Sequence, residues 1–396
     1  MERLALLLLT LACPLGAQQV FVVDDDPGPG VDFTDLEVAV KEAPSGSTLL
    51  VKEGEYLRAD VNGKSLVITA EAGDVVTVTS GILVRNVPSQ ERVVIRGLRI
   101  LGREPMVLFS NPGEVWVENC ELLEDSQSHD PLVQAALHIA YCDSVVVRNT
   151  QGFGGVDTVG LGHPNIPGLV ASFSSVYLYD CHFVGSEGSC SHIHLNTPGY
   201  GGFVYDSFVF ASGTTFQGGV MDGLFCFTFP SGDGLYVDGP SGVSEVVLSN
   251  SQAEPGGGTN PPGEAIRIVS GSVEERIDTV RSFSVPTPIR SNENAMLSFE
   301  GVQGDHMFVR WNPTPQAQWL AHLGIPAPVH LSLASPSLYL GMLNADGTLT
   351  VSLAPALPPG FEATTVFVQG LAYNGGEPPF LFFLPPTAAT VLDPAF

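Results

Sequence analysis

The stretch Val115-Trp116-Val117-Glu118-Asn119-Cys120 decides the fold. Valines that alternate with other residues predict a strand, and an asparagine at a fixed offset predicts the turn that ends it. The phrase returns farther along the chain as Val145-Val146-Val147-Arg148-Asn149-Thr150, Val176-Tyr177-Leu178-Tyr179-Asp180-Cys181 and, more loosely, Val246-Val247-Leu248-Ser249-Asn250-Ser251. A strand and turn that recur at intervals of tens of residues indicate a solenoid, in which each coil covers the next.

The spacing of the repeats predicts where loops project. The strands that begin at Val93, Val115, Val145 and Val176 are separated by 22, 30 and 31 residues. The longer intervals predict loops on one side of the solenoid, and loops of this kind usually form the binding face. Further coils are predicted at 66–69, 75–79, 203–210, 234–237, 246–250, 265–269 and 296–299.

The segment 18–54 predicts the beginning of the solenoid. A strand at 21–23 is followed by a Gly/Pro turn and by a short helix whose apolar positions lie between Leu36 and Ala43. The segment resembles the N-terminal cap and first coil of pectin-lyase-like proteins. This resemblance implies an all-β fold, a right-handed parallel β-helix whose open end is covered by the helix.

Residues 1–17 carry an apolar run from Leu4 to Ala12 and predict a secretory signal that is cleaved after Ala17. The run is too short to span a bilayer, which needs about 20 apolar residues. A lipid anchor on Cys13 is the alternative. Both readings predict a secreted or cell-surface protein.

The parallel β-helix is expected over 18–303, followed by a linker or domain entry over 304–330, where Pro and Gly are frequent. Residues 331–396 predict a small β-sandwich-like module, because Asp346-Gly347 between alternating apolar residues is a hairpin signal. The pattern over 338–370 resembles the C-terminal module of secreted planctomycete-type bacterial proteins. The resemblance implies surface attachment or sorting.

The formal net charge is -26 and the chain contains three lysines, Lys41, Lys52 and Lys64. The charge predicts no nucleic-acid partner and disfavours anionic membranes, because phosphate binding needs clustered Lys and Arg. Solubility explains the acidity, and binding of a divalent cation is the sharper alternative. The oligomeric state is not indicated.

Five cysteines follow the signal, namely Cys120, Cys142, Cys181, Cys190 and Cys226. An odd number leaves at least one thiol unpaired or bonded to another molecule. Cys120 and Cys181 occupy the same place in repeats that are two coils apart, so a separation of about 9–10 Å exceeds the reach of a disulfide. An interior stack is therefore predicted, and Cys181 with Cys190 is the local disulfide to test.

Two motifs resemble those of pectinesterases, which use this solenoid. Gln134-Ala135-Ala136-Leu137 is similar to the motif whose Gln helps to stabilise the oxyanion, and Gly155-Val156-Asp157-Thr158 is similar to the motif whose Asp is the general acid/base. The resemblance implies these roles for Gln134 and Asp157, which are 23 residues apart. Val156 stands where the family has Gln.

The nucleophile of that family has no direct match. Where the family has its nucleophilic Asp, this chain has Ser186-Glu187-Gly188-Ser189, so Glu187 is the candidate replacement. Arg267 is the candidate for the arginine that orients the nucleophile, because no Lys or Arg occurs between Arg148 and Arg267. Ester hydrolysis by a carboxylate needs a nucleophile, a proton donor and an oxyanion site together.

Lyase and glycosidase activities are disfavoured. Uronate lyases need cations and a Lys or Arg base, which the middle coils lack. The polygalacturonase motifs of this fold are matched by Asn149-Thr150-Gln151, Gly162-His163-Pro164 and Arg267-Ile268-Val269, each without its reactive member.

The middle of the chain also offers metal and sugar ligands. His192 and His194 share one face of a strand, which suits a metal, and a divalent cation is the one cofactor with candidate ligands. Aromatic residues crowd the same region: Phe173, Tyr177, Tyr179, Tyr200, Phe203, Tyr205, Phe208 and Phe210. Alternation places Tyr177 and Tyr179 opposite Val176 and Leu178, so these two rings are expected to be exposed and to stack on sugars.

The sequence thus predicts an exported β-helix protein that contacts polysaccharide through its long-loop face. A pectinesterase-like carbohydrate esterase and a structural envelope protein are the alternatives. An esterase requires Gln134 and Asp157 in one cleft with a second carboxylate. A binding protein requires only exposed rings.

Overall fold

The computed structural model describes residues 18–102, 105–124, 135–155, 166–190, 195–222, 230–258, 260–319, 327–376 and 381–396. The predicted signal, Gln134, Asp157, His192 and His194 lie outside the described residues. The chain divides into two compact units. One is formed by 21–45 and 49–277, and the other by 278–396 with short N-terminal pieces.

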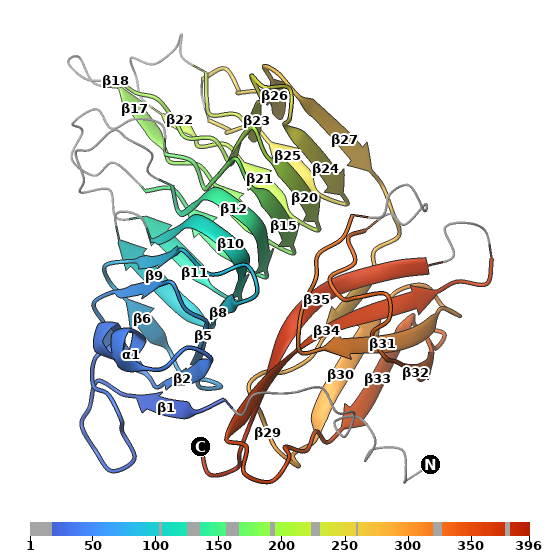
Figure 1. Ribbon diagram of the computed structural model, residues 1–396. Coiled ribbons are helices and arrows are strands. Elements are labelled where there is room, and N and C mark those ends of the chain that lie inside the picture. The colour runs from blue at the N-terminus through green and yellow to red at the C-terminus, as the bar shows by residue number, and fades with distance from the viewer. Residues whose placement is uncertain are drawn as a thin grey trace. The chain divides into compact units, whose positions relative to one another are not determined.

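The first unit is a stack of coils whose strands form three columns (Figure 1). The first column pairs β4 (Ala59–Asn62), β7 (Ile82–Arg85), the first half of β10 (Met106–Glu118), the first half of β12 (Leu137–Arg148), β14 (Leu169–Ser172), β19 (Gly202–Tyr205), β23 (Leu235–Asp238) and β26 (Ile266–Ile268). All these pairs are parallel.

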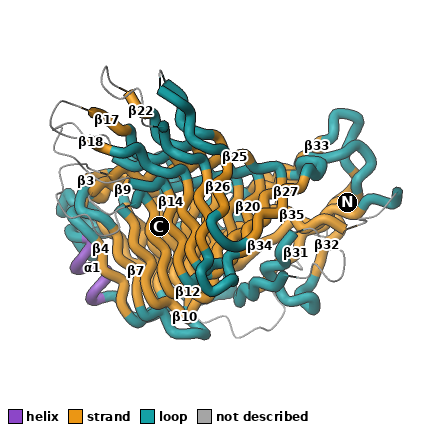
Figure 2. The backbone as a smooth tube through the Cα atoms, turned by 90° about the horizontal axis from the view of Figure 1, so that it is seen from above, coloured by secondary structure: helices purple, strands orange, loops and turns teal. Residues whose placement is uncertain are grey.

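The second column contains β1 (Val20–Val23), β2 (Ser47–Val51), β5 (Leu66–Ala70), β8 (Arg92–Arg96), the second halves of β10 and β12, β15 (Ser175–Tyr179), β20 (Phe208–Ser212), β24 (Glu245–Ser249) and β27 (Ser272–Arg276). The third contains β3 (Gly54–Tyr56), β6 (Val76–Val78), β9 (Leu98–Gly102), β11 (Glu121–Glu124), β13 (Gln151–Phe153), β16 (His182–Val184), β21 (Thr215–Gln217) and β25 (Gln252–Glu254). Figure 2 shows the strands of successive coils in parallel rows. The expected right-handed parallel β-helix is confirmed.

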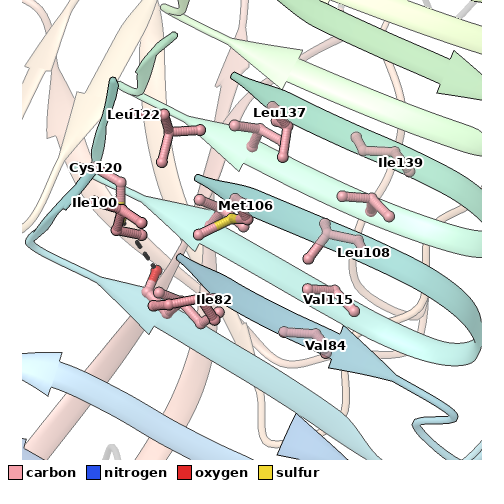
Figure 3. Close-up of a cluster of buried hydrophobic side chains, with 14 of the residues drawn as sticks. Ile82, Val84, Ile100, Met106, Leu108, Val115, Cys120, Leu122, Leu137 and Ile139 are labelled. Atoms are coloured by element: carbon pink, nitrogen blue, oxygen red, sulfur yellow. Dashed lines mark hydrogen bonds between the residues drawn. The ribbon is translucent and has the colours of Figure 1, made fainter. Parts of the chain in front are cut away.

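The interior of the solenoid is filled by stacked aliphatic side chains. Ile82, Met106 and Leu137 are aligned in register on successive coils, and Val84, Leu108 and Ile139 form a second row (Figure 3). All six are buried. Because every second residue of a strand points to the same face, one alternating pattern per coil is enough to build a continuous core.

The asparagine turns of the repeat form a column at the end of the second strands. Asn119, Asn149, Asp180 and Asn250 all have positive φ, between 45° and 53°. The Nδ2 atom of Asn149 donates to Oδ1 of Asn119 over 2.8 Å. Asn and Asp tolerate this left-handed conformation better than other non-glycine residues, which explains why they recur there.

The cap helix is present as α1 (Leu36–Glu42). The side chain of Asp35 accepts a hydrogen bond from the Val38 amide, so it caps the first turn. Leu36, Ala39 and Val40 are buried and join the solenoid core, as the sequence predicted. No helix among the described residues is long and apolar enough to cross a membrane.

Glycine closes the side of the solenoid between the third column and the next first column. The amide of Gly199 donates to the Ser186 carbonyl, Gly219 to Gly199, Gly232 to Gly219 and Gly256 to Gly232. A Cβ atom on Gly199 would overlap the carbonyl oxygen of Ile166. Backbone therefore packs directly on backbone here, which only glycine permits. A separate small sheet is formed by β17 (Gly188–Cys190), β18 (Leu195–Asn196) and β22 (Met221–Asp222).

The cysteine stack is confirmed and the proposed disulfide is wrong. Cys120, Cys142 and Cys181 are free and buried. The Cys120 amide donates to Thr150 Oγ1 over 3.4 Å, and the Cys181 amide to Thr214 Oγ1 over 3.3 Å, so the stack runs along the coils. Burial raises the pKa of the Cys120 thiol to about 11 and that of Cys181 to about 12, so both stay protonated and unreactive.

The second unit contains two mainly antiparallel sheets. One comprises β28 (Ser282–Ser284), β30 (Ala295–Glu300) and β33 (Thr348–Leu353). The other comprises β29 (Ile289–Arg290), β35 (Leu381–Leu392), β34 (Ala363–Tyr373), β31 (His306–Asn312) and β32 (Ser337–Met342). Phe283 and Phe299 from the first sheet share a core with Val309 and Val368 from the second, which makes a sandwich.

The domain boundary lies earlier than expected. The parallel pairing of one coil with the next ends with β27 at Arg276, whereas the sequence placed the end of the solenoid at 303. The stretch 296–299 is not a coil, because β30 pairs antiparallel with β28 and β33. The region 304–330, expected as a linker, contains β31, an internal strand of the five-stranded sheet. Alternating apolar residues fit both folds, so the pattern alone misassigned these strands.

Candidate functional site

The outward face of the first column carries a row of exposed aromatic rings. The inward rows of this column belong to the core, so the alternate residues point outward. Phe109 is 44% exposed, Tyr141 53% and Phe173 44%. Tyr205 is half-buried on the next coil. Each of four successive coils therefore contributes one ring, at the ends of β10's first half, β12's first half, β14 and β19.

These four rings touch one another in order. The ring centroids of Phe109 and Tyr141 are 5.8 Å apart in an edge-on arrangement. Tyr141 and Phe173 are 5.0 Å apart and nearly parallel, at 6°. Phe173 and Tyr205 are 5.3 Å apart, again edge-on. We call these four residues the aromatic ladder.

Two residues of the ladder have an unusual backbone. Tyr141 has φ 55° and Phe173 has φ 49°. In four other coils the same position is Gly63, Asn86, Ser110 or Asp206, all with positive φ. A left-handed conformation costs a bulky residue about 1–2 kcal/mol, and such strain persists where the surroundings or a function require it.

At the end of each of these four strands the ring takes one of two adjacent positions, and a smaller residue takes the other. In the coils where the ring is Tyr141 or Phe173, the preceding residue is small, Ala140 or Ser172. In the coils where the ring is Phe109 or Tyr205, it stands in the preceding position, and the left-handed residue is Ser110 or Asp206. Each of the four coils of the ladder thus has one large ring and one smaller residue at the end of its first-column strand.

The ladder continues into a second group of rings. Tyr205 lies 6.4 Å from Phe203, Phe203 lies 5.4 Å from Tyr236, and Tyr236 stacks on Tyr200 at 4.8 Å and 22°. Phe203, Tyr236 and Tyr200 are half-buried. We call the ladder together with these three residues the aromatic strip.

Ion pairs occupy both ends of the strip. Arg85, in register with Phe109, binds Asp60 through Nη2 at 2.8 Å and Nε at 3.2 Å. Arg267, in register with Tyr236, lies 3.1 Å from Asp233 and 3.5 Å from Glu264.

Asp233, the partner of Arg267, is a buried carboxylate. Its side chain is 3% exposed and also accepts the Glu264 amide at 2.7 Å. Burial raises the pKa of Asp233, and the bonds from the Glu264 amide and Arg267 oppose this rise.

The expectation that Tyr177 and Tyr179 are exposed is wrong. Their side chains do point out of the solenoid, but Tyr177 is 7% exposed and Tyr179 is 2% exposed. Tyr177 packs on Phe208 at 5.9 Å and Tyr179 on Phe210 at 5.8 Å. Trp116 and Val146, in register with Tyr177, are buried as well, so the outward side of these strands is buried at this position on successive coils. These tyrosines therefore cannot stack on a sugar.

Of the four sequence-predicted catalytic residues, the structure describes Glu187 and Arg267. Gln134 and Asp157 fall outside the described residues, and so do the metal candidates His192 and His194. Glu187 is exposed, just before β17. Arg267 pairs with Asp233 and Glu264. No group of three or more metal-ligating side chains occurs among the described residues.

A signal for the ladder was present in the sequence. Phe109, Tyr141, Phe173 and Tyr205 are separated by 32 residues each (141−109, 173−141, 205−173). The aromatic-rich middle region singled out from the sequence included Phe173, Tyr200, Phe203 and Tyr205. Phe109, Tyr141 and Tyr236 were missed. Tyr141 stands at a left-handed turn position, about which alternation within a strand says nothing.

The fold and this surface define a parallel β-helix protein with an exposed aromatic strip. No family model matches the chain, and neither does any curated protein. The chain is similar to the enzymatically active domain of tailspike protein 2 from bacteriophage CBA120, with 9% identity, 93% of this chain and 75% of that chain covered, and a TM-score of 0.29. It is also similar to pectate lyase Pel9A, with 12% identity, 67% and 78% covered, and a TM-score of 0.27. Scores this low add nothing to the fold that the parallel pairing defines.

Proposed function

We propose that this chain is an exported, surface-associated β-helix protein that binds polysaccharide along the aromatic strip. The observation that carries the proposal is the ladder itself, with three rings 44% to 53% exposed on successive coils. Exposed aromatic rings are costly in water and mark binding surfaces when they are contiguous. The export part rests on the signal predicted at 1–17.

The geometry of the ladder suits an extended glycan. Successive coils of a parallel solenoid are about 4.8 Å apart, and the ring centroids of the ladder follow this step at 5.0 to 5.8 Å. This step resembles the length that one pyranose unit adds to an extended chain. Apolar C–H groups of sugars pack against aromatic rings, and Tyr141 and Tyr205 add hydroxyl groups that can form hydrogen bonds.

The backbone strain at Tyr141 and Phe173 also supports a binding role. Asn86 and Ser110 show that a small polar residue fits the same turn. A ring at this position therefore adds strain that a purely structural turn does not need. Strain kept at an exposed ring is expected where the ring contacts a ligand.

The proposal can be tested by affinity electrophoresis of the full chain through gels that contain soluble polysaccharides. We expect retardation by at least one glycan, and its loss in a Tyr141→Asn, Phe173→Asn double variant. Asn is chosen because Asn86 occupies the same position in an earlier coil. Tyr339→Ala is the matched control, since Tyr339 is 50% exposed on the other unit.

Retardation that is unchanged in the double variant would contradict the strip as the binding surface. An absence of retardation in every gel would favour a structural envelope protein. Release of methanol or acetate from esterified pectins and xylans, measured in parallel, tests the esterase alternative.

A further inference from the structure

We infer that the aromatic strip selects uncharged polysaccharides and rejects uronic acid polymers. This inference rests on the proposed function and adds the chemical class of the ligand. It follows from the distribution of charge around the strip and not from the rings, which would stack on either class of glycan.

The coils that carry the strip are poor in basic side chains that could receive a carboxylate. Between Arg103 and Arg267 the sequence has one Lys or Arg, Arg148, and the stretch 149–266 alone contains ten acidic residues. Arg148 lies in the second column, on the strand paired with Tyr179's strand, and not on the strip. His138 is in register with Phe203's row, but burial lowers its pKa, so it is neutral at neutral pH.

The arginines at the two ends of the strip are already neutralised. Arg85 makes two bonds with Asp60, and Arg267 pairs with Asp233 and Glu264. Asp233 is buried, so removing Arg267 to a ligand would leave a buried carboxylate without its cation. Neither arginine is therefore available to a uronate at low cost.

Carboxylates lie instead beside the rings, where sugar hydroxyls would donate to them. Asp206 follows Tyr205 directly, and Asp238 is in register with Tyr205. Oδ1 of Asp206 accepts from Ser241, and Oδ1 of Asp238 accepts from Ser270 Oγ at 2.9 Å. Among the described residues no donor reaches Oδ2 of either group, which leaves one acceptor on each for a hydroxyl-rich ligand.

The experiment compares matched pairs of polymers that differ in charge and share a backbone. The pairs are methyl-esterified and de-esterified homogalacturonan, hydroxyethyl and carboxymethyl cellulose, and dextran and dextran sulfate. Binding of the full chain is measured by affinity electrophoresis and titration calorimetry, at about 10 mM and about 500 mM salt. We expect the uncharged member of at least one pair to bind at least about tenfold more tightly at low salt.

Salt dependence separates charge exclusion from a simple preference for one sugar. High salt should narrow the difference, because it screens repulsion between the acidic coils and the anionic polymer. Binding of the uncharged polymer should depend little on salt. The Tyr141→Asn, Phe173→Asn variant should lose binding of the uncharged polymer, whereas Tyr339→Ala should keep it.

The outcomes distinguish the two proposals. Equal binding of both members of every pair, lost in the strip variant, would overturn charge selection and keep the strip as a polysaccharide site. Tighter binding of the anionic member, with or without added calcium chloride, would also overturn charge selection. If no polymer binds, the proposed function fails and the selection fails with it.

Discussion

Tyr141 and Phe173 lie on consecutive coils with their rings 5.0 Å apart and 6° from parallel, and both have a left-handed backbone. The pair is the centre of the aromatic ladder. Two residues with a strained backbone thus contribute their rings to one exposed surface. No single coil could form this surface, since each coil supplies one ring.

Replacing Tyr141 by Asn should leave stability nearly unchanged. The substitution removes about 1–2 kcal/mol of left-handed strain and loses two ring contacts of about 0.5–1.5 kcal/mol each, so we expect a net change within about 2 kcal/mol. Urea unfolding measures it. A loss of several kcal/mol would mean that the ladder holds the coils together, and would favour a structural role for the rings.

Gly199→Ala should destabilise the solenoid by more than about 2 kcal/mol, because the added Cβ overlaps the Ile166 carbonyl and cannot be relieved by side-chain rotation. Gly257→Ala is the control, since nothing lies within 4 Å of a Cβ at that position. The denaturant midpoints of the two variants should differ clearly. Equal midpoints would show that the glycine backbone packing is looser than the structure indicates.

The third prediction concerns the stability that the column of asparagine turns contributes. Asn149→Ala loses the 2.8 Å bond to Asn119 and places alanine at φ 45°. We expect a loss of about 1–2 kcal/mol, and a smaller loss for Asn149→Gly, which tolerates the conformation. Thermal unfolding checks the order of the two variants, and the reverse order would contradict the role assigned to the turn.

His330 should make the C-terminal unit sensitive to acid. Burial lowers the pKa of His330 from 6.5 to about 3. Above pH 6.5 neither the folded nor the unfolded state holds the proton. Between about 6.5 and 3 only the unfolded state gains it, so stability falls with falling pH by about 1.4 kcal/mol per unit.

The measurement for His330 is the free energy of unfolding at several pH values between 7 and 5, for the wild-type chain and for His330→Gln. The variant should show a shallower dependence on pH, by close to one proton. Parallel curves for the two proteins would mean that His330 is solvated or protonated in the folded state.

The strand-and-turn phrase was sufficient to predict the solenoid and its cap. Val115–Cys120 and its repeats form strands and turns in register, and Asp35 caps a helix where the sequence placed one. The end of the solenoid was not predictable in the same way. The residues 296–299 alternate as a coil strand does, but they pair antiparallel with Ser282–Ser284 and Thr348–Leu353.

The surface depended on relations that a single strand does not contain. Alternation correctly placed Tyr177 on the outer side of its strand, yet the side chain is buried there. It packs on Phe208, and Trp116 and Val146, in register with it on neighbouring coils, are buried as well. The aromatic strip lies on the first column of strands.

The sequence by itself determined the periodic fold, because the pairing of each coil with the next repeats one local pattern of apolar residues and turns. Only the tertiary structure decided which rings reach solvent and which charges are already paired. Exposure and ion pairing depend on neighbours that lie a whole coil away, such as Tyr141 beside Phe173 and Arg267 beside Asp233. A single coil of the sequence holds one partner of each such pair.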